Sequence, residues 1–186
     1  MAAVPVFCFT SLSGKWDDNG MNEVTVRAAT MEDIPVMVDI WHQSTADFIA
    51  QMPAGFGAPM KVPFDGDEYA SSAAWLGKTL ADDDHYALVT VVDGVVRGFL
   101  GGEIRRTTDD FFHAPYFYIN HLYVDRTMRH AGLGRALMDG IERWGKEKGM
   151  HALDMEVGDL NVSGIKFYAS LGFIPLSRRM ARMLDR

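Results

Sequence analysis

The sequence contains a single cysteine, Cys8, among 186 residues. One cysteine forms neither an intrachain disulfide nor a cysteine-based metal cluster, so a disulfide-stapled scaffold is excluded and we expect no metal site. No apolar run approaches the ~18 residues of a membrane-spanning helix. No Lys or Arg precedes the short apolar run at residues 4–9, as a signal peptide would require. These absences favour a cytoplasmic protein that does not enter a membrane.

Basic charge is also scarce. There are 18 Lys and Arg residues against 25 Asp and Glu residues, which gives a formal net charge of −7. Nucleic-acid binding needs a basic footprint, so this balance argues against a nucleic-acid partner. A negative surface favours a cationic partner such as an amine, although charge that serves only solubility would give the same balance.

The apolar pattern predicts one domain over residues 23–186, preceded by a flexible N-terminal extension at residues 1–22. An alternative is that translation begins at Met21. The pattern predicts strands over 23–28, 85–92, 95–104, 117–124 and 152–157, with one or two more over 173–184. It predicts helices over 34–52, 68–81, 133–148 and 163–171. This order is that of a mixed α/β domain.

Local signals fix several element ends. Asp93-Gly94 separates two β-branched runs and predicts a tight hairpin, because a type I′ turn needs positive φ at both central residues. Asp67 is expected to cap the second helix. Thr30 or Asp33 is expected to cap the first, and Asp33 would place Pro35 in the first turn, where a missing N–H is tolerated.

The informative stretch is a predicted strand at 118–124 that leads through a glycine-containing turn into a helix. Gly132 and Gly134 lie where the helix begins, and Arg129 and Arg135 flank them. The first N–H groups of a helix have no partner within it and attract anions such as a pyrophosphate. An ordinary strand–helix turn would show the same residues. The Walker and Gly-x-Gly-x-x-Gly patterns are absent, which disfavours P-loop and Rossmann proteins.

A second signal lies downstream, where Asn161 is followed seven residues later by Tyr168 within the segment 167–173. Taken alone, Asn161 could be a helix cap and Tyr168 a core aromatic residue.

Together, the strand at 118–124, the loop from Arg129 to Gly134 and the Asn161–Tyr168 block resemble the GNAT N-acetyltransferase superfamily. The resemblance spans about residues 24–184. It implies a central, mostly antiparallel twisted sheet of six to seven strands flanked by about four helices. A splayed pair of parallel strands would hold the cofactor. It also implies acetyl-CoA as the acetyl donor and a primary amine as the acceptor.

The resemblance assigns cofactor contacts to Leu122, Tyr123, Val124, Arg129, His130, Ala131, Gly132, Leu133, Gly134, Arg135, Asn161 and Tyr168. Main-chain groups of Leu122 and Val124 would hold the pantetheine arm, and the N–H groups from His130 to Arg135 would hold the pyrophosphate. Tyr168 would be the general acid that protonates the departing thiolate, since a phenol is still protonated at neutral pH.

The resemblance does not supply a general base, because Asn120 stands where many family members have Glu. An alkyl ammonium with a pKa near ~10.4 needs about 4.6 kcal/mol to deprotonate at pH 7. An amide accepts no proton in this range, so Asn120 could only orient a water. Glu103 and His121 are possible substitutes, although strand alternation would point His121 away from Asn120. A β-bulge would change that, and a substrate that binds as the neutral amine needs no base.

The acceptor is expected to be a small-molecule amine held between residues 41–69 and 175–183, where relatives build their pocket. Candidates for an apolar wall are Trp41, Phe48, Phe56, Phe64 and Tyr69. A peptide or protein amino group is one alternative, and a non-catalytic CoA-binding sensor on the same fold is another. A homodimer is possible, as in relatives.

Overall fold

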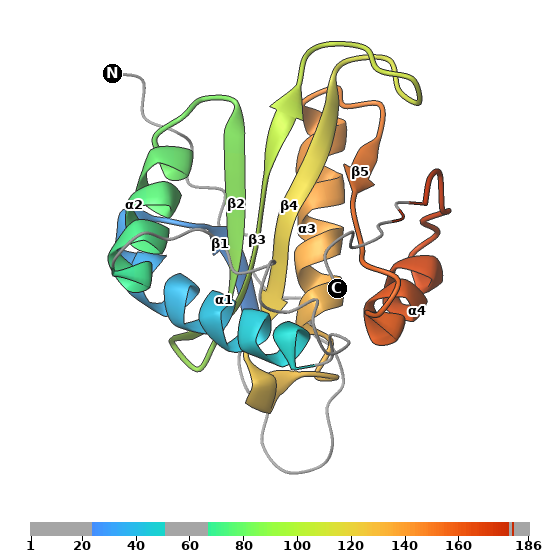
Figure 1. The fold of residues 1–186 in the computed structure, drawn as a ribbon. Helices are drawn as coiled ribbons and strands as arrows, with labels where there is room; N and C mark the ends of the chain where they lie inside the picture. The colour runs from blue at the N-terminus through green and yellow to red at the C-terminus, as the bar shows by residue number, and fades with distance from the viewer. Residues whose placement is uncertain (1–23, 51–66, 179, 181–186) are drawn as a thin grey trace. The chain divides into compact units, whose positions relative to one another are not determined.

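A computed structural model describes residues 24–50, 67–178 and 180 of the chain (Figure 1). The chain divides into two compact units, of which the first ends at Glu156 and the second begins at Val157. The first unit contains β1 (Val24–Ala28), α1 (Ile34–Ile49), α2 (Glu68–Leu80), β2 (His85–Val92), β3 (Val95–Arg105), β4 (Tyr116–Val124), α3 (Leu133–Glu147) and β5 (Leu153–Met155). The second contains α4 (Val162–Ser170). The predicted N-terminal extension lies outside the described residues.

The five described strands form one sheet in the order β1-β2-β3-β4-β5. The first four pair antiparallel, whereas β4 and β5 run parallel and pair only from Phe117 to Ile119. The mixed α/β fold with a mostly antiparallel sheet is therefore confirmed. Over the described residues 173–178 the expected further strand does not form. Ile174 there is 74% exposed, so its side chain is not packed against a sheet.

The helices of the first unit cover both faces of its sheet (Figure 1). Beneath α1 and α2 lies a buried cluster that includes Met37, Leu76 and Phe99. On the other face Trp144 of α3 stacks on Tyr86, with ring centroids 4.2 Å apart. None of the described helices has the length and apolarity needed to cross a membrane.

Local sequence signals account for the element ends. Asp93 and Gly94 have φ values of 49° and 79°, which is the predicted hairpin turn. The Asp67 carboxylate caps α2 by accepting the N–H groups of Tyr69 and Ala70. Before α1 a short 3-10 turn, η1 (Met31–Asp33), intervenes, and the Asp33 carboxylate accepts two hydrogen bonds from Arg27 at 2.7 and 2.8 Å.

Strand β4 carries one residue more than β3 at Asn120. Gly101 lies opposite His121 and Gly102 opposite Ile119, so Asn120 is the extra residue of a β-bulge. A bulge bends its strand and redirects side chains. In a regular strand, residues three apart point to opposite faces of the sheet. The bulge places His121 on the same face as Tyr118. The sequence did not decide whether this strand contains a β-bulge, and the structure contains one.

Gly102 is required opposite this bulge, because a Cβ there would collide with the Tyr118 carbonyl oxygen and the Phe117 ring. We expect Gly102→Ala to lower the free energy of unfolding by about 1–3 kcal/mol, as overpacking does. Gly101→Ala is the matched control, since its Cβ would meet only Ala87 Cβ, at 3.6 Å. Urea denaturation of both variants measures the difference. Equal losses would show that the close approach at Gly102 is not a constraint.

Candidate active site

The predicted phosphate-binding loop follows β4 directly. A 3-10 turn, η2 (Arg126–Met128), leads to His130 and Gly132, which have φ values of 66° and 77°. Gly132 is the N-cap of α3, and no side chain caps the helix. The first amide of the helical ladder is that of Ala136, which donates to the Gly132 carbonyl at 3.0 Å. The preceding N–H groups and the alternating sign of φ form a concave arrangement suited to a phosphate.

Among the described residues, no strand pairs with the edge of β4 on the side of β5 beyond Ile119. The Asp125 N–H donates to the Arg97 carbonyl on β3, at 2.8 Å. Hydrogen-bonding direction alternates along an antiparallel strand, so the main-chain groups of Leu122 and Val124 point away from β3. Strand β5 ends at Met155, opposite Ile119, and does not reach them. An extended ligand arm could pair there as an added strand, which fits the pantetheine arm of CoA.

Two arginines at this loop share one carboxylate. Asp47, in the last turn of α1, contacts Arg126 at 2.5 Å and Arg129 at 2.8 Å. Burial alone would raise the pKa of Asp47, but the hydrogen bond from Arg129 and the charges of both arginines lower it overall. An acidic group is unfavourable at a helix C-terminus, and the two guanidinium groups offset this. Asp47 was not predicted as a site residue. An acidic residue in the last turn of a predicted helix, where the helix dipole disfavours it, is the signal that could have indicated a cationic partner.

Asn161 and Tyr168 lie in the second unit. The Asn161 side chain accepts the N–H of Gly164 at 2.9 Å and caps α4. Tyr168 is partly buried in α4, and its ring contacts those of Phe167 and Phe173. Asn161 therefore has the structural role of a helix cap, and its predicted role toward the cofactor stays a prediction, as does that of Tyr168.

The candidate base Glu103 lies on β3, opposite Tyr118 and two register positions from the pair formed by Gly101 and His121. Its carboxylate pairs with Arg105 at 2.5 Å and lies 3.8 Å from His85. The structure thus gives Glu103 a cationic partner on its own strand. Asn120 is partly buried at the bulge.

His121 is surrounded by aromatic rings on the α1/α2 face of the sheet. Its ring centroid lies 4.8 Å from that of Trp41 and 4.9 Å from that of Trp75. Phe99 and Tyr123 complete what we call the aromatic cluster, at 6.2 and 5.8 Å. Burial lowers the pKa of His121 to about 4, so the imidazole is neutral at pH 7 and a weaker base than its type suggests. Of the predicted wall residues that the structure describes, only Trp41 belongs to the cluster, whereas Phe56 and Phe64 lie outside the described residues. Trp75 was not predicted.

The β4 edge beyond Ile119 and the positive-φ start of α3 are features that suit a protein of the class that binds a phosphate-bearing cofactor with an extended arm. The comparisons with known proteins place it within this class. The model of the acetyltransferase (GNAT) family matches residues 49–173, and the chain belongs to that family. It is an acyltransferase that depends on acetyl-CoA.

Named relatives are distant in sequence. Over 99 residues, which are 52% of this chain and 68% of the relative, it is 26% identical to aminoglycoside N(6')-acetyltransferase type 1 of Salmonella typhimurium. A solved protein of Bacillus halodurans has a TM-score of 0.72 at 22% identity, over 86% of this chain and 99% of that one. An aminoglycoside N-acetyltransferase solved with a CoA-linked bisubstrate analogue has a TM-score of 0.64 at 18% identity, over 88% and 99%. These structural likenesses establish the fold.

The burial of His121 makes stability depend on pH. Its pKa falls from 6.5 to about 4 on folding, so between these values the unfolded chain binds a proton that the folded chain does not. With respect to this group, the free energy of unfolding is highest above pH 6.5. It falls by about 3 kcal/mol as the pH falls from 6.5 to about 4.

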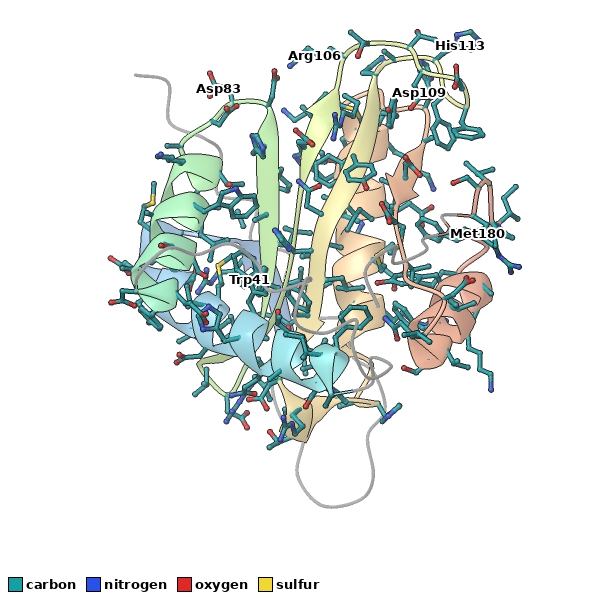
Figure 2. The ribbon with its side chains drawn as sticks, viewed as in Figure 1. Trp41, Asp83, Arg106, Asp109, His113 and Met180 are labelled. Carbon is teal, nitrogen blue, oxygen red and sulfur yellow. The ribbon has the colours of Figure 1, made fainter. Side chains whose placement is uncertain are left out.

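We therefore expect urea denaturation at pH 7 and pH 4.5 to show a smaller pH-dependent loss in His121→Phe than in the wild type. The control is His113→Phe, in the exposed connection between β3 and β4 at the other end of the sheet from α1 (Figure 2). This control is expected to keep the full loss. A loss in His121→Phe equal to that of the wild type would contradict the burial argument.

Proposed function

We propose that this chain transfers the acetyl group of acetyl-CoA to a primary amine of a small molecule. The observation that carries the proposal is the continuous run from the free edge of β4 to the start of α3 at Gly132. The β4 edge can pair with an extended arm, and the start of α3 can bind a pyrophosphate. The pantetheine arm and the pyrophosphate follow each other in the same order in CoA. Support for a small-molecule acceptor comes from the aminoglycoside acetyltransferases among its relatives and from the net charge of −7.

In this proposal the chain holds the donor mostly by main-chain groups. Leu122 and Val124 pair with the pantetheine arm, and the N–H groups between His130 and Arg135 take the pyrophosphate. Arg129, placed by Asp47, lies within the same loop and adds positive charge. Because backbone groups supply most of these contacts, the glycine at position 132 matters more than the side chains around it.

The chemistry is a direct attack of the neutral amine nitrogen on the thioester carbonyl carbon. A C–N bond forms and the C–S bond breaks, the amine gives up one proton, and the thiolate receives one. We assign the donation to the Tyr168 hydroxyl. The amine proton leaves through a water that Asn120 orients at the bulge, with Glu103 as the second candidate acceptor.

Calorimetric titration with acetyl-CoA and with CoA tests the cofactor site. We expect both to bind the wild type, and Gly132→Ala to weaken binding about ten-fold or more, because alanine disfavours the left-handed conformation and adds a Cβ beside the phosphate. Gly149→Ala is the matched control: its φ of 73° brings similar strain, and nothing lies within 4 Å of its Cβ. Equal affinities of the two variants for CoA would show that the phosphate does not bind at the start of α3.

Tyr168→Phe tests the general acid. We expect kcat to fall about 100-fold, in the range typical of a lost general acid, while the Kd for acetyl-CoA stays unchanged. Tyr86→Phe, whose ring stacks on Trp144 under α3, is the control with wild-type turnover. An unchanged kcat in Tyr168→Phe would remove this role. Acetyl-CoA binding without CoA release on any amine or peptide would favour the sensor alternative.

A further inference from the structure

Both ring nitrogens of His121 are shielded from solvent, and neither has a hydrogen-bond partner in the part of the chain that the structure describes. A neutral imidazole carries one donor and one acceptor. Leaving them unpaired in a protein interior is unfavourable, and folded proteins keep few such groups. A phenylalanine of similar size would fill the space without this penalty. The imidazole is therefore the feature that calls for a partner beyond the residues that the structure describes.

The surroundings of His121 restrict what that partner is. The rings that contact it come from α1 (Trp41), α2 (Trp75), β3 (Phe99) and β4 (Tyr123), and none of them carries a charge at neutral pH. The Tyr123 hydroxyl already interacts with Thr45, and burial raises its pKa. A ligand in this cluster would meet uncharged ring faces and the two imidazole nitrogens of His121.

We propose that the aromatic cluster binds the body of the acceptor, that the acceptor carries one primary amine on an apolar or aromatic framework, and that His121 accepts a hydrogen bond from that amine. This inference rests on the proposed acetyltransferase function and narrows its substrate class. It differs from what the named relatives act on, since an aminoglycoside carries several amines and many hydroxyl groups.

Charge decides between the two classes of acceptor. A polycationic sugar needs a carboxylate or a water for each ammonium, and the described rings around His121 supply no carboxylate. Aromatic faces attract a cation, but this attraction is smaller than the penalty for removing an ammonium from water without a counter-ion. The cluster therefore favours a single amine bound in its neutral form, and that is the form that attacks a thioester.

The position of the cluster suits this role. His121 adjoins the bulge residue Asn120, and the open main-chain groups begin at Leu122, the next residue along β4. Trp75 is 37% exposed and forms the outer wall of the cluster. Rotation of this side chain would admit an amine to the imidazole, because partly exposed side chains change rotamer rapidly.

The experiment compares two acceptors, phenethylamine and kanamycin, by the rate of CoA release. The variants are His121→Phe, which keeps the aromatic volume, and the exposed control His113→Phe. We expect kcat/KM to be at least ten-fold higher for phenethylamine than for kanamycin. In His121→Phe the KM for phenethylamine is expected to rise about ten-fold, as for one lost hydrogen bond. The melting temperature should stay level or rise, because an unpaired polar group is removed.

Each other outcome overturns a defined part of this inference. Turnover of kanamycin but not of phenethylamine would overturn the substrate class and leave the proposed function standing. An unchanged KM in His121→Phe, or a lower melting temperature with a matching loss of activity, would overturn the role of His121. If acetyl-CoA still binds but no CoA is released with either amine or with a wider panel of amines, the proposed function itself is overturned.

Discussion

The extra residue in β4 at Asn120 is the constraint on which the rest of the site depends. Pairing between β4 and β5 stops at Ile119, one residue before the bulge. A parallel strand that continued alongside would occupy the main-chain groups of Leu122 and Val124, and no extended ligand could use them. The same extra residue places His121 among the rings of α1 and α2. One local irregularity thus separates the proposed cofactor edge from the proposed acceptor face.

Ion pairs in the first unit connect α1 with the loop that precedes α3. Asp47 belongs to the helix that also carries Trp41, and its partner Arg129 belongs to the loop that precedes α3. Partly exposed ion pairs contribute little to stability, about 0–1 kcal/mol. Their value here is positional, because they fix the guanidinium group of Arg129 relative to the cofactor loop. A shift of α1 would therefore move Arg129 relative to the proposed phosphate site.

Features set by neighbouring residues could be predicted from the sequence, and features set by distant contacts could not. The Asp93-Gly94 turn and the Asp67 cap depend on a few adjacent residues and follow from their conformational preferences. The glycine-rich start of α3 was visible for the same reason. The bulge depends on register with β3, and the Asp47–Arg129 pair joins residues far apart in the chain. Only the packing of two helices on the sheet shows that the ring nitrogens of His121 are shielded from solvent, and this shielding lowers the pKa of the imidazole below that expected of its residue type.

The replacement of a family glutamate by Asn120 becomes understandable in terms of that burial. The surroundings that lower the pKa of His121 from 6.5 to about 4 act on any cation in the same place. An alkyl ammonium with a pKa of ~10.4 that was destabilised to a similar extent would lose its proton near pH 8. A bound amine of this kind needs no strong base for the chemical step. Of the deprotonation cost of about 4.6 kcal/mol at pH 7, about 3 kcal/mol is then met on binding, where it raises KM, and only about 1 kcal/mol remains in the chemical step. An apolar acceptor can offset that cost through its own buried surface, which a polyhydroxylated one cannot.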